Sequence, residues 1–477
     1  MPFTAIRRLA MPAALSLTTL SLTALLLAGC ASAPPVAPPP LAAFVVLGPD
    51  GAAVARVVTD APACPAIVID GQPQAMQLRA APATIAQRAT KNQPADSKPA
   101  AFPVLSCERM LPAGTASASV AGQPLPLPKA APQRIVVIGD TGCHLLKGSD
   151  AYQPCNDPAL YPFAMVAAQA AAWQPDLVLH VGDYHYRETA CPDGNAGCAG
   201  SPWGYGWDAW NADFFAPAAV LLRAAPWVVA RGNHETCFRG GQGWWRFLDP
   251  RPPLPGRDCN AAADDAVGDY SDPYAVPLGP DTQLLVIDTA ATTWRGLKPG
   301  DLGYDKYRDV YLKLEALARR APHNIGVTHH PLLALGADRD KDGAVVILKG
   351  DLGLQQSWGS LNPQLLPASI QTMLSGHVHL WQQMSFSSGH PSQFVSGFSG
   401  TAEDIVPLPL PLPDGLTPAP GAVVRNVSSW IDGFGYMTME RRGPEQWEVG
   451  VHDLQGKLRN TCRIDGRDSV CATMQVR

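Results

Sequence analysis

Five short polar motifs recur along this chain, and each follows a run of apolar residues typical of a buried strand. The motifs are Gly139-Asp140-Thr141-Gly142, Gly182-Asp183-Tyr184-His185-Tyr186, Gly232-Asn233-His234-Glu235, Val327-Thr328-His329-His330-Pro331 and Gly376-His377-Val378-His379. An Ala-rich stretch from Pro158 to Trp173 is expected to be helical. Alternating strands and helices predict an α/β fold, whose sheet places ligands at the carboxyl ends of its strands.

The motifs supply enough oxygen and imidazole donors to hold two metal ions, an arrangement suited to hydrolysing phosphate esters. These donors are Asp140, Asp183, Tyr186, Asn233, His329, His377 and His379. An isolated Gly-Asp is more often a turn, and an isolated His-x-His is more often a pair of surface or core histidines. Five motifs at successive strand ends favour metal binding instead. Within His329-His330 either residue is a candidate ligand, and the position of His329 two residues before Pro331 favours it.

Taken in order, the five motifs resemble those of the calcineurin-like metallophosphoesterases over about Arg134 to Arg441. Most of that superfamily has Asp-x-His in the first motif, whereas this chain has Gly142 there and Tyr186 in Gly-Asp-x-x-Tyr. This combination resembles the purple acid phosphatase subgroup. The resemblance implies a four-layer α/β/β/α sandwich with a binuclear centre of Fe(III) and a divalent metal (Zn, Mn or Fe), because a phenolate favours a ferric ion.

The resemblance also assigns roles to individual residues. Metal one would be held by Asp140, Asp183, Tyr186 and His379, and metal two by Asp183, Asn233, His329 and His377. His234 would stabilise charge or protonate the leaving group during attack of a metal-bound hydroxide on a phosphomonoester at acidic pH. Glu235 is expected to orient His234 or a loop, or to be a helix-start carboxylate. His144 and His185 are not at the expected offsets and are expected to be structural or outside the ligand set.

Two other functions fit the same motifs. One is a phosphodiesterase, nucleotidase or pyrophosphatase, and the other is a non-catalytic surface module that retains the fold. The complete ligand set argues against the second. The net charge of −5 offers no basic surface, so nucleic acid is not an expected partner. The sequence does not specify the natural substrate or the oligomeric state.

The first thirty residues are predicted to be a targeting segment. Arg7-Arg8 precedes an apolar run from Ala13 to Ala28 that is short for a membrane span. The run ends in Leu27-Ala28-Gly29-Cys30, which resembles a bacterial lipoprotein signal with Cys30 as the lipidated residue. An ordinary secretory signal or a short anchor is the alternative. Ala31 after the cysteine favours attachment to the outer membrane, facing the periplasm.

We expect five segments. They are a signal peptide at 1–29, a Pro-rich tether at 30–41, a small all-β sandwich-like domain at 42–128, the catalytic domain at 132–455 and a disulfide-stapled tail at 456–477. The β-domain is predicted from short strand-like runs separated by Gly, Pro and Asp turns.

Ten cysteines remain besides Cys30, an even number that suits an oxidising compartment. Sequence alone does not settle their connectivity, and we predict pairing between neighbours. The pairs would be Cys64–Cys107, Cys143–Cys155, Cys191–Cys198, Cys237–Cys259 and Cys462–Cys471.

Two further patterns have simple structural explanations. Asp338, Asp340 and Asp342 resemble the start of a calcium loop, but Lys349 stands where the bidentate acid belongs, which favours a solvated turn. The aromatic residues Trp203, Tyr205, Trp207 and Trp210 are expected to pack an insertion or, less favoured, to form a substrate wall.

Overall fold

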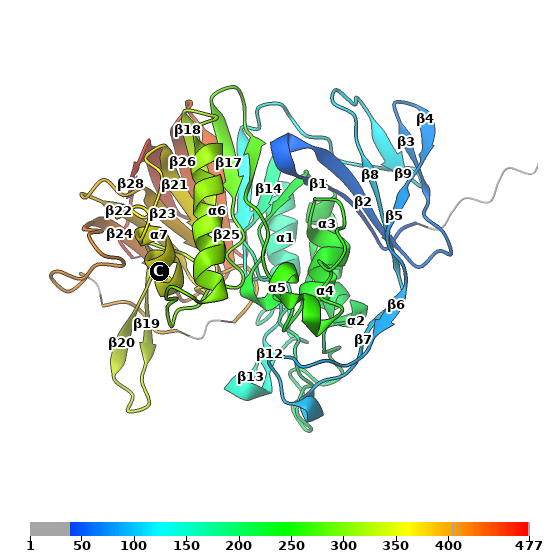
Figure 1. The fold of residues 1–477 in the computed structure, drawn as a ribbon, viewed down its shortest axis with the longest axis horizontal. Coiled ribbons are helices and arrows are strands. Elements are labelled where there is room, and N and C mark those ends of the chain that lie inside the picture. The colour runs from blue at the N-terminus through cyan, green and yellow to red at the C-terminus, as the bar shows by residue number, and fades with distance from the viewer. Residues whose placement is uncertain (1–38, 403–404, 410, 476–477) are drawn as a thin grey trace, which may run out of the picture. The chain divides into compact units, whose positions relative to one another are not determined.

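Two large sheets packed face to face dominate the computed structural model, which describes residues 39–402, 405–409 and 411–475 (Figure 1). The predicted signal peptide, Cys30 and most of the tether lie outside these residues. Among the described residues, the larger sheet runs in the order β28 (Asp468–Cys471), β27 (Leu458–Asp465), β26 (Gln446–Asp453), β25 (Gly435–Arg441), β11 (Arg134–Ile138), β14 (Leu177–His180), β15 (Trp227–Val229), β1 (Ala42–Leu47), β2 (Ala53–Thr59), β8 (Leu105–Met110) and β5 (Gln77–Ala80).

The second large sheet has its own parallel centre. Its order is β16 (Tyr274–Pro277), β17 (Thr282–Val286), β18 (His323–Val327), β21 (Ile370–Ser375), β23 (Ser392–Ser396), β22 (Trp381–Phe386) and β24 (Val424–Trp430). The neighbours β17, β18, β21 and β23 are parallel, as are β11, β14 and β15 in the first sheet. The carboxyl ends of each parallel set therefore lie at one edge of its sheet.

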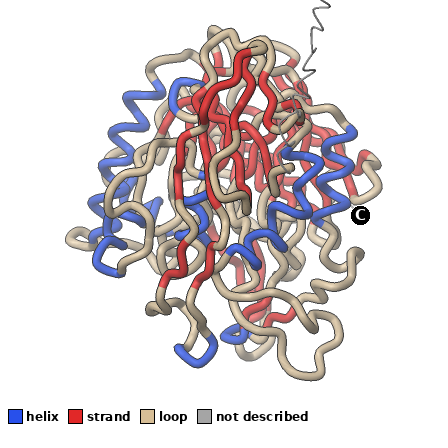
Figure 2. The backbone as a smooth tube through the Cα atoms, turned by 90° about the vertical axis from the view of Figure 1, so that its right-hand side faces the viewer, coloured by secondary structure: helices blue, strands red, loops and turns tan. Residues whose placement is uncertain are grey.

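Helices cover the outer faces of both sheets, and Figure 2 shows the strands between them. They are α1 (Phe163–Ala172), α2 (Trp207–Trp210), α3 (Ala216–Leu222), α4 (Gly241–Gly243), α5 (Asp265–Gly268), α6 (Leu302–Ala318) and α7 (Leu352–Gly359). Along β11, Ile135 and Val137 enter the core between the sheets, whereas Val136 and Ile138 join the core under α1 and α3. The residues of β17 alternate in the same way, with Leu285 facing α6 and α7. Strands buried on both faces need apolar side chains at every position, which explains the apolar runs. The predicted four-layer α/β fold is confirmed.

The predicted β-rich N-terminal region is also present. Its remaining strands are β3 (Ala66–Ile69), β4 (Gln72–Ala75), β6 (Ala83–Ile85), β7 (Ala100–Phe102), β9 (Ala118–Val120) and β10 (Gln123–Pro124). The order β10-β9-β3-β4 forms a small sheet that packs on β1, β2 and β8. The structure adds a feature that the sequence did not indicate. Strand β1 pairs in parallel with β15, with Val46 opposite Trp227, so the region continues the main sheet of the catalytic part.

All five predicted disulfides are confirmed: Cys64–Cys107, Cys143–Cys155, Cys191–Cys198, Cys237–Cys259 and Cys462–Cys471. The last joins β27 to β28. Five disulfides are typical of an oxidising, exported location. In the described part of the chain, no helix has both the length and the apolar character needed to cross a bilayer.

The Asp-rich pattern lies in a surface turn, and most of the aromatic residues of the insertion lie in the core. The Asp-rich turn joins β19 (Leu335–Arg339) to β20 (Val345–Lys349), and Asp340 Oδ1 accepts the backbone N–H groups of Asp342 and Ala344. Tyr205, Trp207 and Trp210 are buried in the core beside α3, which agrees with the packing interpretation. A further two-stranded piece, β12 (Leu145–Leu146) with β13 (Ala151–Tyr152), lies near the first motif.

Arg56 should be a main anchor between the N-terminal region and the catalytic part. Its buried guanidinium donates to the carbonyls of Phe247 at 2.6 Å and Asp249 at 3.0 Å, and it pairs with Glu108 at 3.1 Å. The Arg56→Ala variant leaves these acceptors buried without a donor and should lower the free energy of unfolding by about 3 kcal/mol. Denaturant unfolding measures the loss. Arg109→Ala, a half-buried control on the neighbouring strand, should cost under about 1 kcal/mol, and equal losses would contradict the anchoring role.

Candidate metal centre

The polar motifs follow strand ends, as the sequence predicted. Asp140 follows β11, Asp183 follows β14 and His377 follows β21. All three have left-handed backbones, with φ of 54°, 58° and 71°. Such conformations are uncommon for residues with a Cβ and are concentrated at functional sites. The sharp turns send the side chains toward one another, and the first two loops are joined by the N–H of Asp140, which donates to the carbonyl of Gly182 at 3.0 Å.

Three other donors converge around the phenol of Tyr186. Its Oη atom lies 3.0 Å from Asp140 Oδ1, 2.8 Å from Asp183 Oδ2 and 2.8 Å from His379 Nε2. All four side chains are buried. These are the residues that the sequence assigned to metal one, and the structure brings them together.

A second group of donors adjoins the first through Asp183. His329 Nε2 lies 3.1 Å from Asp183 Oδ2 and 3.0 Å from Asn233 Oδ1. His377 Nδ1 lies 3.0 Å from the same Asn233 oxygen. These residues match the set assigned to metal two, and Asp183 belongs to both groups. The metal-binding role of all seven stays a prediction, but their convergence is a feature of the fold.

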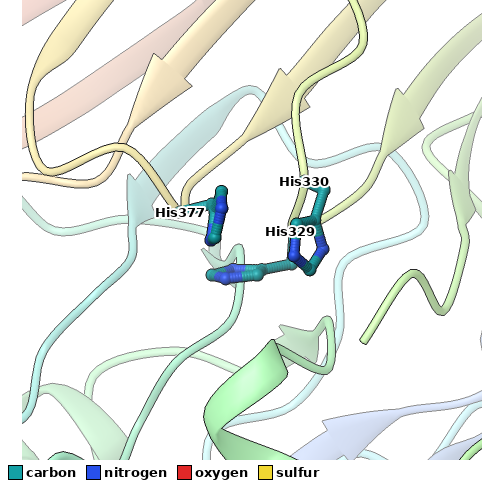
Figure 3. A group of neighbouring side chains, drawn as sticks. All are labelled: His329, His330 and His377. Atoms are coloured by element: carbon teal, nitrogen blue, oxygen red, sulfur yellow. The ribbon is translucent and has the colours of Figure 1, made fainter. Parts of the chain in front are cut away.

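His330 lies beside this second group. Figure 3 shows it together with His329 and His377. One ring nitrogen from each of the three residues lies within 4.8 Å of the other two. The ring of His330 is 4.2 Å from that of His377, and its buried Nδ1 atom has no hydrogen-bond partner among the described residues. His329 is the residue that contacts both Asp183 and Asn233, which supports the choice made from the sequence.

The glycine in the first motif is explained by the position of Tyr186. A Cβ atom on Gly142 would lie 2.7 Å from the backbone nitrogen of Tyr186 and 2.9 Å from Asp213 Oδ2. Asp213 accepts the backbone N–H of Tyr186 at 2.7 Å and so fixes the loop that carries the phenol. A residue with a side chain at position 142 is therefore incompatible with this conformation of the loop that carries Tyr186. Sequence reasoning missed Asp213, which sits among aromatic residues of the insertion without a motif around it.

Burial and neighbouring charge shift the pKa values in this centre. Burial, followed by the charges of Asp183 and Asp140, raises the pKa of Tyr186 well above its ordinary value. Burial disfavours the charged form of His329, but the Asp183 carboxylate outweighs this and raises its pKa to about 9. Burial and the charge of His329 lower the pKa of His377 to about 3. The phenol can therefore ionise only if cations balance the carboxylates, and the oxygen and imidazole donors suit such ions.

The chain also matches a known protein family. A family model described as calcineurin-like phosphoesterase matches residues 133–380, more than half of the chain. The chain belongs to the calcineurin-like phosphoesterase family. Membership makes it a phosphoester hydrolase and confirms the family predicted from the five motifs. A comparison with curated proteins gives no significant match.

The solved structures to which this chain is similar are distant in sequence. Purple acid phosphatase PPD1 from yellow lupin (Lupinus luteus) seeds is 14% identical, with 91% of this chain and 74% of that chain covered and a TM-score of 0.48. PhoD is 12% identical, with coverage of 92% and 94% and a TM-score of 0.49. A dimetal phosphatase from Danio rerio is 11% identical, with coverage of 72% and 99% and a TM-score of 0.36.

In this phosphoesterase His234 lies directly against Tyr186, with ring centroids 3.7 Å apart. Its Nδ1 atom is 3.0 Å from Glu188 Oε1 and 3.1 Å from the carbonyl of His185, so Nδ1 carries a proton and Nε2 points toward Asp183. Burial, with the charge of Arg239, lowers the pKa of His234 to about 3, and the nearby carboxylates only partly oppose this. Burial thus favours the neutral form of His234.

Glu188, rather than Glu235, orients His234. The buried carboxylate of Glu188 pairs with Arg239 and accepts the Tyr205 hydroxyl at 2.8 Å. Glu235 instead accepts backbone N–H groups of the second and third motifs, including that of Asp183 at 3.1 Å, and so supports a loop. Sequence reasoning missed Glu188 because the residue falls two positions beyond the recognised motif.

The two remaining histidines near the motifs differ in position. The ring of His144 lies 5.4 Å from that of Tyr186 and 6.5 Å from that of His379, at the side of the donor groups. His185 is buried, and its Nε2 atom lies 2.8 Å from the carbonyl of Gly204. His185 is therefore structural, whereas His144 borders the centre.

The N-terminal region also contacts the residues that surround His234. Residues 88–98 run along the insertion, where Arg88 donates to the carbonyl of Cys259 at 2.6 Å and pairs with Asp265. Asn92 Nδ2 donates to the Tyr205 hydroxyl at 3.1 Å. The chain Asn92–Tyr205–Glu188 thus links the N-terminal region to His234.

The Glu188→Gln variant should lower kcat at least about tenfold while the metal content per chain stays unchanged, because it removes the charge that faces His234 Nδ1. His234→Ala should lower kcat about 100-fold. The double variant should be no worse than His234→Ala alone, since both changes act through one imidazole. Kinetics and metal analysis check this, with Glu315→Gln on the outer surface of α6 as the control. Additive losses would show that Glu188 acts independently of His234.

Proposed function

We propose that this chain is a two-metal phosphatase of the purple acid phosphatase type, which hydrolyses phosphomonoesters at acidic pH. The observation that carries the proposal is the position of the Tyr186 phenol, which meets two carboxylates and the His379 imidazole at one point. In the proposal, Asp140, Asp183, Tyr186 and His379 would hold Fe(III). Asp183, Asn233, His329 and His377 would hold a divalent ion (Zn, Mn or Fe).

The donor set fits two cations of different character. An anionic phenolate with two carboxylates suits a trivalent ion, and a neutral amide with two imidazoles suits a divalent one. When bound, the cations would activate a water molecule and place positive charge opposite the phosphate oxygens. Asp183 lies between the two groups, where its negative charge reduces the repulsion between neighbouring cations.

His234 supplies the proton-handling group in this proposal. Its Nδ1–H is held by Glu188, so only Nε2 is available to the reacting phosphate. An approaching phosphate dianion favours the protonated imidazole, as any nearby negative charge does. The imidazolium would then neutralise a phosphate oxygen or protonate the departing alcohol.

The cellular setting is also a proposal. The five disulfides support export. Lipidation of Cys30 and attachment to the outer membrane, facing the periplasm, rest on the sequence of the first thirty residues.

Tyr186→Phe tests the assignment of the first metal. The variant keeps the ring packed on His234 but removes the only phenol oxygen in the first group of donors. The wild type, loaded with two metals, should absorb visible light through a phenolate–Fe(III) transition and hydrolyse monoesters faster than diesters. The variant should lose the visible band and most of its iron. A colourless wild type that binds a single metal per chain would overturn the proposal.

The neighbouring histidines provide a matched pair for the second metal. His329→Ala removes a donor that contacts both Asp183 and Asn233, and should cut the content of the divalent metal from about one ion per chain to well below half. His330→Ala removes the same side chain one residue away and should keep about one ion per chain. Metal analysis after dialysis compares the two variants, and the reverse pattern would assign the ligand role to His330.

A further inference from the structure

We propose that a cleft beside His379 binds the organic group of the ester and selects an uncharged, ring-bearing group over one that carries a second phosphate. This inference rests on the proposed phosphatase function and names its substrate class. The cleft has a volume of about 740 Å³, in the range of small-molecule sites. It begins at His379 and Thr401, so a group bound in it can be joined to a phosphate at the metal centre.

One side of the cleft is an apolar wall. It is formed by Phe398, Trp430 and Ile431, and the half-exposed side chain of Phe434 lies at its end. The rings of Phe398 and Trp430 pack edge to face with centroids 5.6 Å apart. A Cβ atom on Gly433 would lie 2.6 Å from the Trp430 ring, so the loop between β24 and β25 lies flat against the indole. The wall is therefore closely packed, and Phe434, its most exposed aromatic side chain, is best placed to cover a bound ring.

The charges of the cleft oppose a polyanionic group. Arg459 pairs with Asp453 at 3.5 Å and lies over the Trp430 ring. Its positive charge is therefore partly balanced within the cleft wall. Asp453 also accepts the backbone N–H groups of Gln455 and Lys457, each at 3.0 Å. Asp432 adds an exposed carboxylate to the same lining. Two carboxylates with one guanidinium leave an excess of negative charge, which repels a second phosphate but accepts hydroxyl or amino groups.

The experiment measures binding as well as turnover. Isothermal titration of the metal-loaded protein compares phenylphosphonate with methylphosphonate, which share the anionic group and differ only in the ring. The wild type should bind phenylphosphonate at least about fivefold more tightly, and Phe434→Ala should remove most of that preference. Trp294→Ala, which deletes an aromatic side chain that is 70% exposed outside the cleft, should leave the preference intact.

Turnover tests the charge selection. The wild type should show a kcat/KM for phenyl phosphate well above that for fructose 1,6-bisphosphate. Asp432→Lys should raise kcat/KM for the bisphosphate about tenfold, with little change for glycerol phosphate.

The two hypotheses fail in different ways. Equal binding of the two phosphonates by the wild type, or an unchanged preference in Phe434→Ala, would overturn the cleft assignment whatever the activity. Selective binding of phenylphosphonate without hydrolysis of any ester would overturn the phosphatase function and keep the cleft as a ligand site.

Discussion

The carboxylate of Asp183 is the group on which the rest of the centre depends. Its Oδ2 atom contacts both the phenol of Tyr186 and the imidazole of His329, and the side chain is buried. A buried carboxylate is costly unless charge or hydrogen bonds compensate it. Here His329 and the backbone N–H of His234 would do so without metal, and cations would do so more strongly. The site therefore combines a need for positive charge with the donors that bind it.

A layer of buried acids outside the two groups of donors holds this arrangement in place. Glu235 ties the second motif to the third through backbone N–H groups, Asp213 fixes the Tyr186 loop, and Glu188 orients His234. Each carboxylate accepts several hydrogen bonds, which offsets the cost of its burial. The left-handed backbones of Asp140 and Asp183 persist because these surrounding contacts over-determine the loops.

The sequence predicted those parts of the molecule that depend on local pattern. Asp140 and His377 were predicted as ligands because each follows an apolar strand after a single glycine, and a strand end fixes where the next residues lie. Neighbouring cysteines such as Cys191 and Cys198 paired as predicted because short loops bring them together at low entropic cost. Glu188 and Asp213 were missed because their partners are chosen by three-dimensional packing. The pairing of β1 with β15 was missed for the same reason. The edge of a parallel sheet can accept any strand whose apolar residues fit the two faces of the sheet.

That pairing changes the meaning of the N-terminal region. As a separate module it would only hold the catalytic part away from a membrane. In the structure its strand β1 pairs with β15, the last of the parallel strands, whose loop carries Asn233 and His234. Its Asn92 side chain also donates to the Tyr205 hydroxyl, which contacts Glu188. An exposed parallel edge next to the catalytic loop would be a site for aggregation and a source of motion in His234. The region therefore belongs to the architecture of the candidate metal centre, because it contacts the strand and the acid that together place the His234 imidazole.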